Sequence, residues 1–201
     1  QPIWQMTAVE ISAAVRRGDL SAVEVTESIL GRIETLDVHL NAFCTSMADS
    51  ARATAASIDE RVSRGESVGR LAGVPISIKD NLYIEGERTT FGSLWFEENV
   101  TPEDTPLVSR LKRADAVLIG RPNSPWFRWK GATDNLVFGT MRNPWDPSRT
   151  PGGRSGGASA AVSAGMGLPG IGTDGGGSLR VPAAVCGLFG IKASYDRMPH
   201  H

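Results

Sequence analysis

The stretch that decides the fold of this chain is residues 150–184, "TPGGRSGGASAAVSAGMGLPGIGTDGGGSLRVPAA". Most of its residues are Gly, Ala or Ser, which is also the composition of flexible linkers. A linker is polar and joins two folded units, whereas this stretch contains side chains that favour burial, such as Val162, Met166 and Ile171. Few residues follow it. We therefore interpret it as closely packed backbone within a folded domain.

A second interpretation of the same stretch is a nucleotide site. Residues 170–175 match the pattern G-x-G-x-x-G, and Asp196 lies near the position of a ribose-binding acid. The fingerprint requires a strand before it and a full helix after it. Two more glycines follow here, and then Pro182 interrupts the expected helix. A dinucleotide-binding module is therefore the remote alternative, and no cofactor is expected.

The third interpretation is catalysis. Gly175, Gly176 and Gly177 directly precede Ser178. Glycines adopt backbone angles that turn successive N–H groups toward one point, where an oxyanion can bind. A serine beside such a nest is well placed as a nucleophile, but it needs a base to take its proton. Lys79 follows a very apolar segment, and burial lowers the pKa of an amine toward the range in which it acts as a base.

The N-terminal third of the chain, residues 1–66, is predicted to be mainly helical. Ser21 is followed three residues later by Glu24, which is a capping box at the start of a helix. Asp49 is expected to cap the next helix, and Gly65 to end it.

From residue 71 onward the pattern changes to alternating strands and helices. The segments 71–81 and 116–123 are apolar and are predicted to be buried strands, and 105–115 is predicted to be a helix. This alternation indicates an α/β fold with a partly parallel sheet over residues 71–201.

Composition excludes several classes of function. The chain has 201 residues, with 21 Lys and Arg against 22 Asp and Glu, so we expect no basic face for nucleic acid. No apolar run approaches a membrane span, and no signal peptide is recognised, so no membrane partner is expected. Cys44 and Cys186 are far apart and lack metal-ligand spacing. We expect two thiols in a reducing, cytoplasmic environment and no metal site.

Successive blocks of the sequence resemble the amidase signature family. They include "VPISIKDN" at 74–81, "GRPNSP" at 120–125 and "GIGTDGGGSLRVPAAVCG" at 170–187. The resemblance implies the N-terminal part of that family's fold, a mixed sheet layered between helices, and hydrolysis of a small-molecule amide by a Ser–cis-Ser–Lys triad. By motif, Ser178 matches the nucleophile and Lys79 the base, and the three glycines before Ser178 match the oxyanion hole.

Residue 154 departs from the family pattern. The relay serine of the family lies 24 residues before the nucleophile and follows a cis peptide bond, and this position is Arg154 here. Arginine only donates hydrogen bonds and is not deprotonated in proteins, so it cannot relay a proton. We expect impaired chemistry. The adjacent Ser155 is a candidate substitute, although a shift of one residue is expected to aim its hydroxyl elsewhere. Asp174 and Arg180 flank the nest and are expected to support it as an ion pair.

The resemblance also raises the question of length. Family members are more than twice as long, so residues 1–201 are expected to form a single, incomplete amidase signature domain. The expected partner is a second copy of the chain or the missing C-terminal part of the enzyme. A non-catalytic remnant that binds amide-like ligands is the alternative to an enzyme. A simple amidase and the glutaminase-type subunit of a tRNA amidotransferase both remain open.

Overall fold

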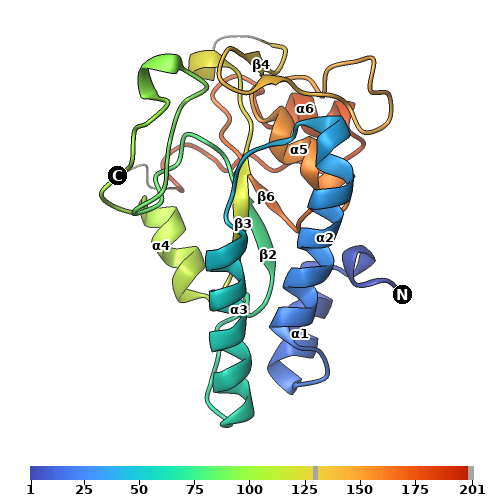
Figure 1. The fold of residues 1–201 in the computed structure, drawn as a ribbon, viewed down its shortest axis with the longest axis vertical. Helices are drawn as coiled ribbons and strands as arrows, with labels where there is room; N and C mark the ends of the chain where they lie inside the picture. Colours follow the sequence, from blue (N-terminus) through green and yellow to red (C-terminus); the bar gives the residue numbers. More distant parts are fainter. Residues whose placement is uncertain (129–130, 199–201) are drawn as a thin grey trace.

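The computed structural model describes residues 1–128 and 131–198. Helices and sheet strands alternate along it (Figure 1). The helices are α1 (Ala8–Arg17), α2 (Ala22–Leu40), α3 (Ala48–Ser63), α4 (Pro106–Arg113), α5 (Gly156–Ser163) and α6 (Arg180–Val185), with 3-10 turns η1 (Ile3–Gln5), η2 (Leu94–Phe96) and η3 (Trp126–Arg128). The strands are β1 (Phe43–Ser46), β2 (Pro75–Ile78), β3 (Val117–Pro122), β4 (Asp134–Asn135), β5 (Gly139–Thr140) and β6 (Gly170–Ile171).

The chain begins with the helices α1, α2 and α3, and residues close in sequence mark where they start. At the start of α2, the Glu24 N–H donates to the Ser21 hydroxyl, and the Ser21 N–H donates to the Glu24 carboxylate. The predicted capping box therefore forms. The prediction for the next helix is wrong by two residues. Met47 occupies the N-cap of α3, and Asp49 lies within its first turn. There its carboxylate still favours the helix by opposing the positive end of the helix dipole.

The main sheet has four strands in the order β1-β3-β2-β6. β2 is parallel to both β3 and β6, whereas β1 runs antiparallel to β3. All residues of β2 and β3 are buried, as expected for strands covered on both faces. The predicted α/β fold with a mixed sheet among helices is thereby confirmed (Figure 1).

One hydrophobic core joins the N-terminal helices to the two central strands. It is built from apolar side chains spaced along one face of each helix and from both faces of the strands. Its fully buried members include Ile11, Val15, Val25, Ile29, Ile58, Ile76, Ile78, Val117 and Ile119. The strands are thus held by packing along their length, and their carboxyl ends are free to present polar residues.

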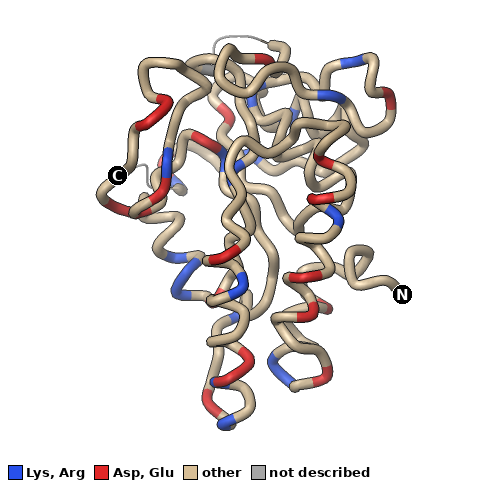
Figure 2. The backbone as a smooth tube through the Cα atoms, in the orientation of Figure 1, with Lys and Arg blue, Asp and Glu red and all other residues tan. Residues whose placement is uncertain are grey.

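Positions of Lys and Arg and positions of Asp and Glu are both spread along the backbone tube in the view of Figure 2. This distribution agrees with the near balance of acidic and basic residues in the sequence. Within the described residues, no helix combines the length and the apolar character needed to cross a membrane.

Candidate active site

The parallel strands bring Lys79 to the edge of the sheet where polar residues collect. Lys79 directly follows β2, and its N–H donates to the carbonyl of Ile171 on β6, at 3.0 Å. Its side chain is fully buried. Lys79 Nζ lies 2.9 Å from Ser155 Oγ and 3.1 Å from Thr173 Oγ1. The carboxyl ends of β2 and β6 therefore place a buried amine between two hydroxyl groups.

Ser155 makes the contact with the lysine. It occupies the N-cap position of α5, and its own N–H donates to the Ser178 carbonyl at 3.0 Å. Its hydroxyl donates to the Thr173 carbonyl at 3.2 Å. Contrary to the expectation that this hydroxyl would be aimed elsewhere, it contacts Lys79, but it makes no hydrogen bond to Ser178 Oγ.

Glycines make this path of the chain possible. Gly152 and Gly153 both have positive φ, 75° and 61°, which bends the backbone just before Ser155. A methyl group on Gly172 would lie 2.8 Å from Ser155 Oγ, so only glycine leaves room for that hydroxyl. A methyl group on Gly157 would lie 2.5 Å from the Asn123 carbonyl oxygen, so α5 packs directly against backbone. The small residues of this stretch therefore serve close packing, as the sequence predicted.

The hydroxyl of Ser178 is buried and unpaired. The residue is 6% exposed, and Ser178 Oγ has no hydrogen-bond partner within the described part of the chain. A buried hydroxyl without a partner carries an unfavourable desolvation cost, which a bound substrate or water would relieve. The backbone of Ser178 is thus hydrogen-bonded to Ser155, and its hydroxyl has no partner among the described residues.

The three glycines before Ser178 differ in their N–H groups. Gly177 donates to Asp174 Oδ1 at 2.6 Å, so this N–H already has an acceptor. The N–H groups of Gly175, Gly176 and Ser178 have no acceptor among the described residues. Gly175 and Gly176 are exposed. Of the three glycines expected to form an oxyanion hole, Gly177 thus has its N–H engaged by Asp174.

Asp174 and Arg180 form the expected ion pair. Arg180 Nε donates to Asp174 Oδ2 at 2.9 Å, and Arg180 Nη2 donates to Oδ1 at 3.1 Å. The backbone N–H groups of Gly177, Leu179 and Arg180 donate to the same carboxylate. The Arg180 guanidinium and these N–H groups hold the pKa of Asp174 well below its usual range. Asp174 is therefore an ionised carboxylate, and its hydrogen bonds fix the loop around Ser178.

This lowered pKa predicts how the loop responds to acid. A depressed folded-state pKa contributes stability that is complete above the unfolded-state pKa, about 3.9, and is lost as the pH falls below it. The free energy of unfolding should be higher for the wild type than for Asp174→Asn at pH 7, and this gap between the two proteins should narrow as the pH falls to 3. Urea unfolding at both pH values measures the gap. Asp196→Asn, at an exposed position with no ion pair to another described residue, is the control, and a gap for Asp174→Asn that stays constant contradicts the prediction.

Arg154 differs from the other arginines of the chain. It is partly buried, in a segment whose other residues from 151 to 160 are all buried. Its side chain makes no hydrogen bond or ion pair with any described residue. Among the described residues, the peptide bond before Pro169 is the one cis bond, so the bond before Arg154 is trans. Arg154 directly precedes Ser155 in the chain, and no hydrogen bond joins it to Lys79 among the described residues.

Thr173 belongs to the site and was missed from the sequence. Its hydroxyl accepts a hydrogen bond from Lys79, and its backbone N–H and carbonyl both bond Ser155 Oγ. A signal was present, because Thr173 comes two residues after the partly buried Ile171, and Lys79 directly follows the buried Ile78. The strand before it, β6, is only two residues long and contains glycine, so no periodicity marked it.

The structure does not fit a dinucleotide fingerprint, since α6 is six residues long and begins only at Arg180.

A buried ion pair lies behind the lysine. Arg121 Nε is 3.2 Å from Asp80 Oδ1, and Arg121 Nη2 donates to the Leu82 carbonyl at 2.8 Å. Asp80 also accepts hydrogen bonds from the N–H and the hydroxyl of Thr90. Both charged side chains are essentially inaccessible to solvent. The pair fixes the backbone immediately after Lys79.

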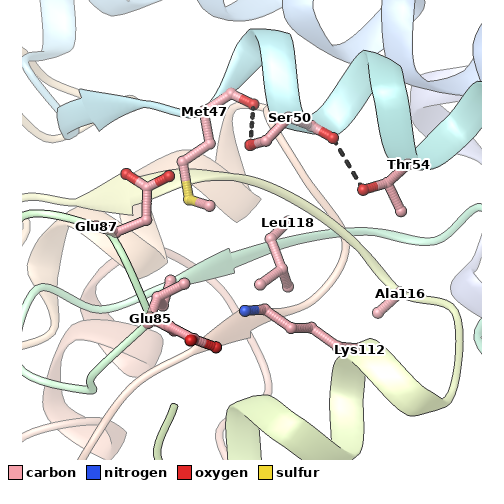
Figure 3. Close-up of a pocket in the computed structure, with 9 residues that line it drawn as sticks. Met47, Ser50, Thr54, Glu85, Glu87, Lys112, Ala116 and Leu118 are labelled. Carbon is pink, nitrogen blue, oxygen red and sulfur yellow. Dashed lines mark hydrogen bonds between the residues drawn. The ribbon is translucent and has the colours of Figure 1, made fainter. Parts of the chain in front are cut away.

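A pocket of about 380 Å³ lies elsewhere, between α3, β3 and α4 (Figure 3). Leu118 and Met47 form part of its apolar lining, while Glu85 and Lys112 line it with charge. None of the predicted site residues lines this pocket. The buried polar atoms around Lys79, and not this cavity, therefore mark the candidate site.

The described residues offer no metal site and no thiol nucleophile. No group of three His, Cys, Asp or Glu side chains is gathered there in a way that would hold a metal ion. Cys44 and Cys186 are both free thiols. Burial raises the pKa of the Cys186 thiol to about 11, and it raises the pKa of Cys44 as well. The serine is thus the candidate nucleophile of this chain.

Comparison with known proteins gives consistent matches. The model of the family described as Amidase matches residues 24–201. A glutamyl-tRNA(Gln) amidotransferase component from Moorella thermoacetica is 43% identical over 199 residues, which cover 99% of this chain and 41% of that protein. Indoleacetamide hydrolase of Bradyrhizobium diazoefficiens is 42% identical over 198 residues, which cover 98% of this chain and 38% of that protein. The chain spans about two fifths of the length of these relatives.

Solved structures give the same picture. A bacterial aryl acylamidase, described as belonging to the amidase signature enzymes, matches with a TM-score of 0.87 and 38% identity, over 92% of this chain and 38% of that one. Fatty acid amide hydrolase matches with a TM-score of 0.87 and 28% identity, over 90% of this chain and 32% of that one.

Proposed function

Since this chain belongs to the amidase signature family, we propose that it hydrolyses a carboxylic amide, with Ser178 as the nucleophile and Lys79 as the base. The observation that carries the proposal is the buried contact of 2.9 Å between Lys79 Nζ and Ser155 Oγ, one backbone hydrogen bond from Ser178. An amine accepts a proton in its neutral form, so Lys79 acts in the proposed reaction as a neutral base.

The reaction begins with attack of Ser178 Oγ on the amide carbon. The O–H bond of Ser178 breaks as its proton passes to Ser155. The original O–H bond of Ser155 breaks in turn, and its proton forms a new N–H bond on Lys79. The oxyanion is held by N–H groups of Gly175, Gly176 and Ser178. Lys79 then returns the proton to the leaving nitrogen as the C–N bond breaks. Water attacks the resulting ester and releases the carboxylate, restoring Ser178.

We propose that this relay is slow. A hydroxyl has one proton, and Ser155 gives it to the Thr173 carbonyl in the resting arrangement. Ser178 Oγ has no hydrogen bond to Ser155. Before the chemical step, Ser155 must turn its proton from Thr173 toward Lys79 and accept the proton of Ser178. Arg154 cannot take part in the relay, because a guanidinium only donates hydrogen bonds and keeps its proton, and this is the physical reason for expecting impaired turnover.

Other parts of the proposal concern the setting of the reaction. The substrate is a small-molecule amide, and neither nucleic acid, membrane nor cofactor takes part. The proposed partner is a second copy of the chain or a C-terminal part like that of the longer relatives, in one amidase signature domain over residues 1–201. The two free thiols are consistent with a cytoplasmic setting.

Release of ammonia or amine from a panel of amides tests the proposal. The panel contains glutaramide, glutamine, indole-3-acetamide and 4-nitroacetanilide, so it covers both the simple amidase and the glutaminase type. The wild type should release product from at least one of them, and Ser178→Ala should fall to the blank. Ser63→Ala, an exposed serine on α3, should match the wild type. A folded wild type with no turnover of any amide would indicate a non-catalytic remnant.

A further inference from the structure

The feature that the proposed reaction leaves unused is the pocket of about 380 Å³ beside α3, β3 and α4 (Figure 3). Its floor is apolar, because Met47, Ile84 and Leu118 line it and all three side chains are buried. Pockets of this size bind small molecules when an apolar surface is combined with a few polar groups that fix the ligand. The pocket can therefore bury the apolar part of a small molecule, and its polar groups decide which molecule fits.

The hydroxyl groups that α3 contributes to the pocket have already used their protons. Ser50 Oγ donates to the Met47 carbonyl at 3.1 Å, and Thr54 Oγ1 donates to the Ser50 carbonyl at 2.8 Å (Figure 3). A hydroxyl has one proton, so each of these oxygens offers a ligand its lone pairs only. The α3 wall thus favours a ligand that donates hydrogen bonds.

Two carboxylates of the pocket have no partner in the chain. Glu85 and Glu87 lie in the segment after β2, and both line the pocket (Figure 3). Neither carboxylate makes a hydrogen bond or an ion pair with another described residue. Glu87 is half-buried, and a partly desolvated negative charge becomes more favourable when a cation binds beside it.

The positive charge at the pocket is already compensated. Lys112 Nζ donates to Asp104 Oδ1 at 2.7 Å, so the ammonium that lines the pocket has a counter-ion. The positive end of the α3 dipole is opposed by Asp49 in the first turn of that helix. The charges that remain for a ligand are therefore those of Glu85 and Glu87.

We infer that this pocket binds a small aliphatic amine, with its ammonium group at the carboxylates of Glu85 and Glu87 and its carbon chain on the apolar floor. An ammonium group has three donors and no acceptor, which matches oxygens that only accept. The inference is independent of the proposed amide hydrolysis, because neither Lys79, Ser155 nor Ser178 lines the pocket.

Calorimetric titration of the full chain with four ligands tests the inference. Hexylamine, hexanol and hexanoate share one apolar chain and differ in charge. Hexylamine should bind about 10-fold more tightly than hexanol, as expected for charge-assisted hydrogen bonds, and added salt should reduce this preference. Equal affinity for hexylamine and hexanol, tighter binding of hexanoate, or no binding of hexylamine overturns the inference.

The fourth ligand separates a free amine from a protein partner. The side chain of lysine carries the same ammonium group on an aliphatic chain, and N-acetyl-lysine methylamide presents it as a peptide does. It should bind more weakly than hexylamine, because its peptide groups cannot be buried on an apolar floor without losing their hydration. Tighter binding of the lysine derivative would assign the pocket to a lysine of another protein and would overturn the inference.

Variants of the two glutamates locate the binding site. Glu85→Gln and Glu87→Gln should each weaken the binding of hexylamine about 3-fold, the usual worth of a partly exposed ion pair. The double variant should bind hexylamine and hexanol alike. Glu103→Gln removes an exposed glutamate that does not line the pocket, and it should bind hexylamine as the wild type does. A preference for hexylamine that survives in the double variant overturns the inference.

Discussion

Replacing Ser155 with alanine should lower kcat about 100-fold or more, which is the range contributed by acid–base catalysis. The substitution removes the hydroxyl that lies 2.9 Å from Lys79 Nζ. It leaves the backbone bond from Ser155 to the Ser178 carbonyl in place. The loss should therefore appear in kcat rather than in folding. Initial rates of amide hydrolysis measure it.

Two companion variants make this result specific. Ser159→Ala removes another buried serine of α5, one turn along the helix, and should leave kcat unchanged. Arg154→Ser restores the family pattern and should raise kcat for neutral diamides. In the Arg154→Ser background, Ser155→Ala should lower kcat by a smaller factor. If Ser155→Ala alone keeps the wild-type kcat, the lysine reaches Ser178 by another route and the proposed relay is wrong.

Replacing Asp80 with alanine should lower the free energy of unfolding by about 3–5 kcal/mol, the usual cost of leaving one partner of a buried ion pair alone. Arg121 would lose the carboxylate beside its Nε, and its Nη1 already has no partner among the described residues. Thr90 would lose the acceptor of both its N–H and its hydroxyl. Urea unfolding gives the change in free energy.

A double-mutant cycle separates the lost pair from the uncompensated charge. The double variant Asp80→Ala/Arg121→Met should lose less free energy of unfolding than the two single variants lose together, because it leaves no unpaired buried charge. Asp19→Ala breaks the exposed pair with Arg17 and should change stability by less than about 1 kcal/mol. A loss as small as this for Asp80→Ala would contradict the assigned role of the buried pair.

The parts of the fold that the sequence predicted depend on neighbours along the chain. The capping box of Ser21 and Glu24 spans three residues, and the buried strand before Lys79 is continuous in sequence. The two-residue strand β6 carries no such pattern and was missed, and Thr173 was missed with it. Short strands with glycine are recognised only from the strand they pair with, here β2.

The candidate site likewise combines features that are set by neighbours in the sequence with features that are set by distant residues. Motifs placed Ser178 and Lys79 in the sequence, but the group that contacts the lysine depends on the path of the backbone. The positive φ angles of Gly152 and Gly153 and the bond from the Ser155 N–H to Ser178 set that path, and none of them is readable from one residue. The pairing of Asp80 with Arg121, 41 residues apart, is equally non-local.

Labelling with a serine-directed fluorophosphonate, followed by intact-mass spectrometry, tests the central claim that Lys79 and Ser155 activate Ser178. We expect a single adduct that maps to Ser178 in the folded wild type, and much slower labelling of Lys79→Met and Ser155→Ala. Absence of an adduct on the folded wild type, or labelling that is as fast without the Ser155 hydroxyl, would contradict it.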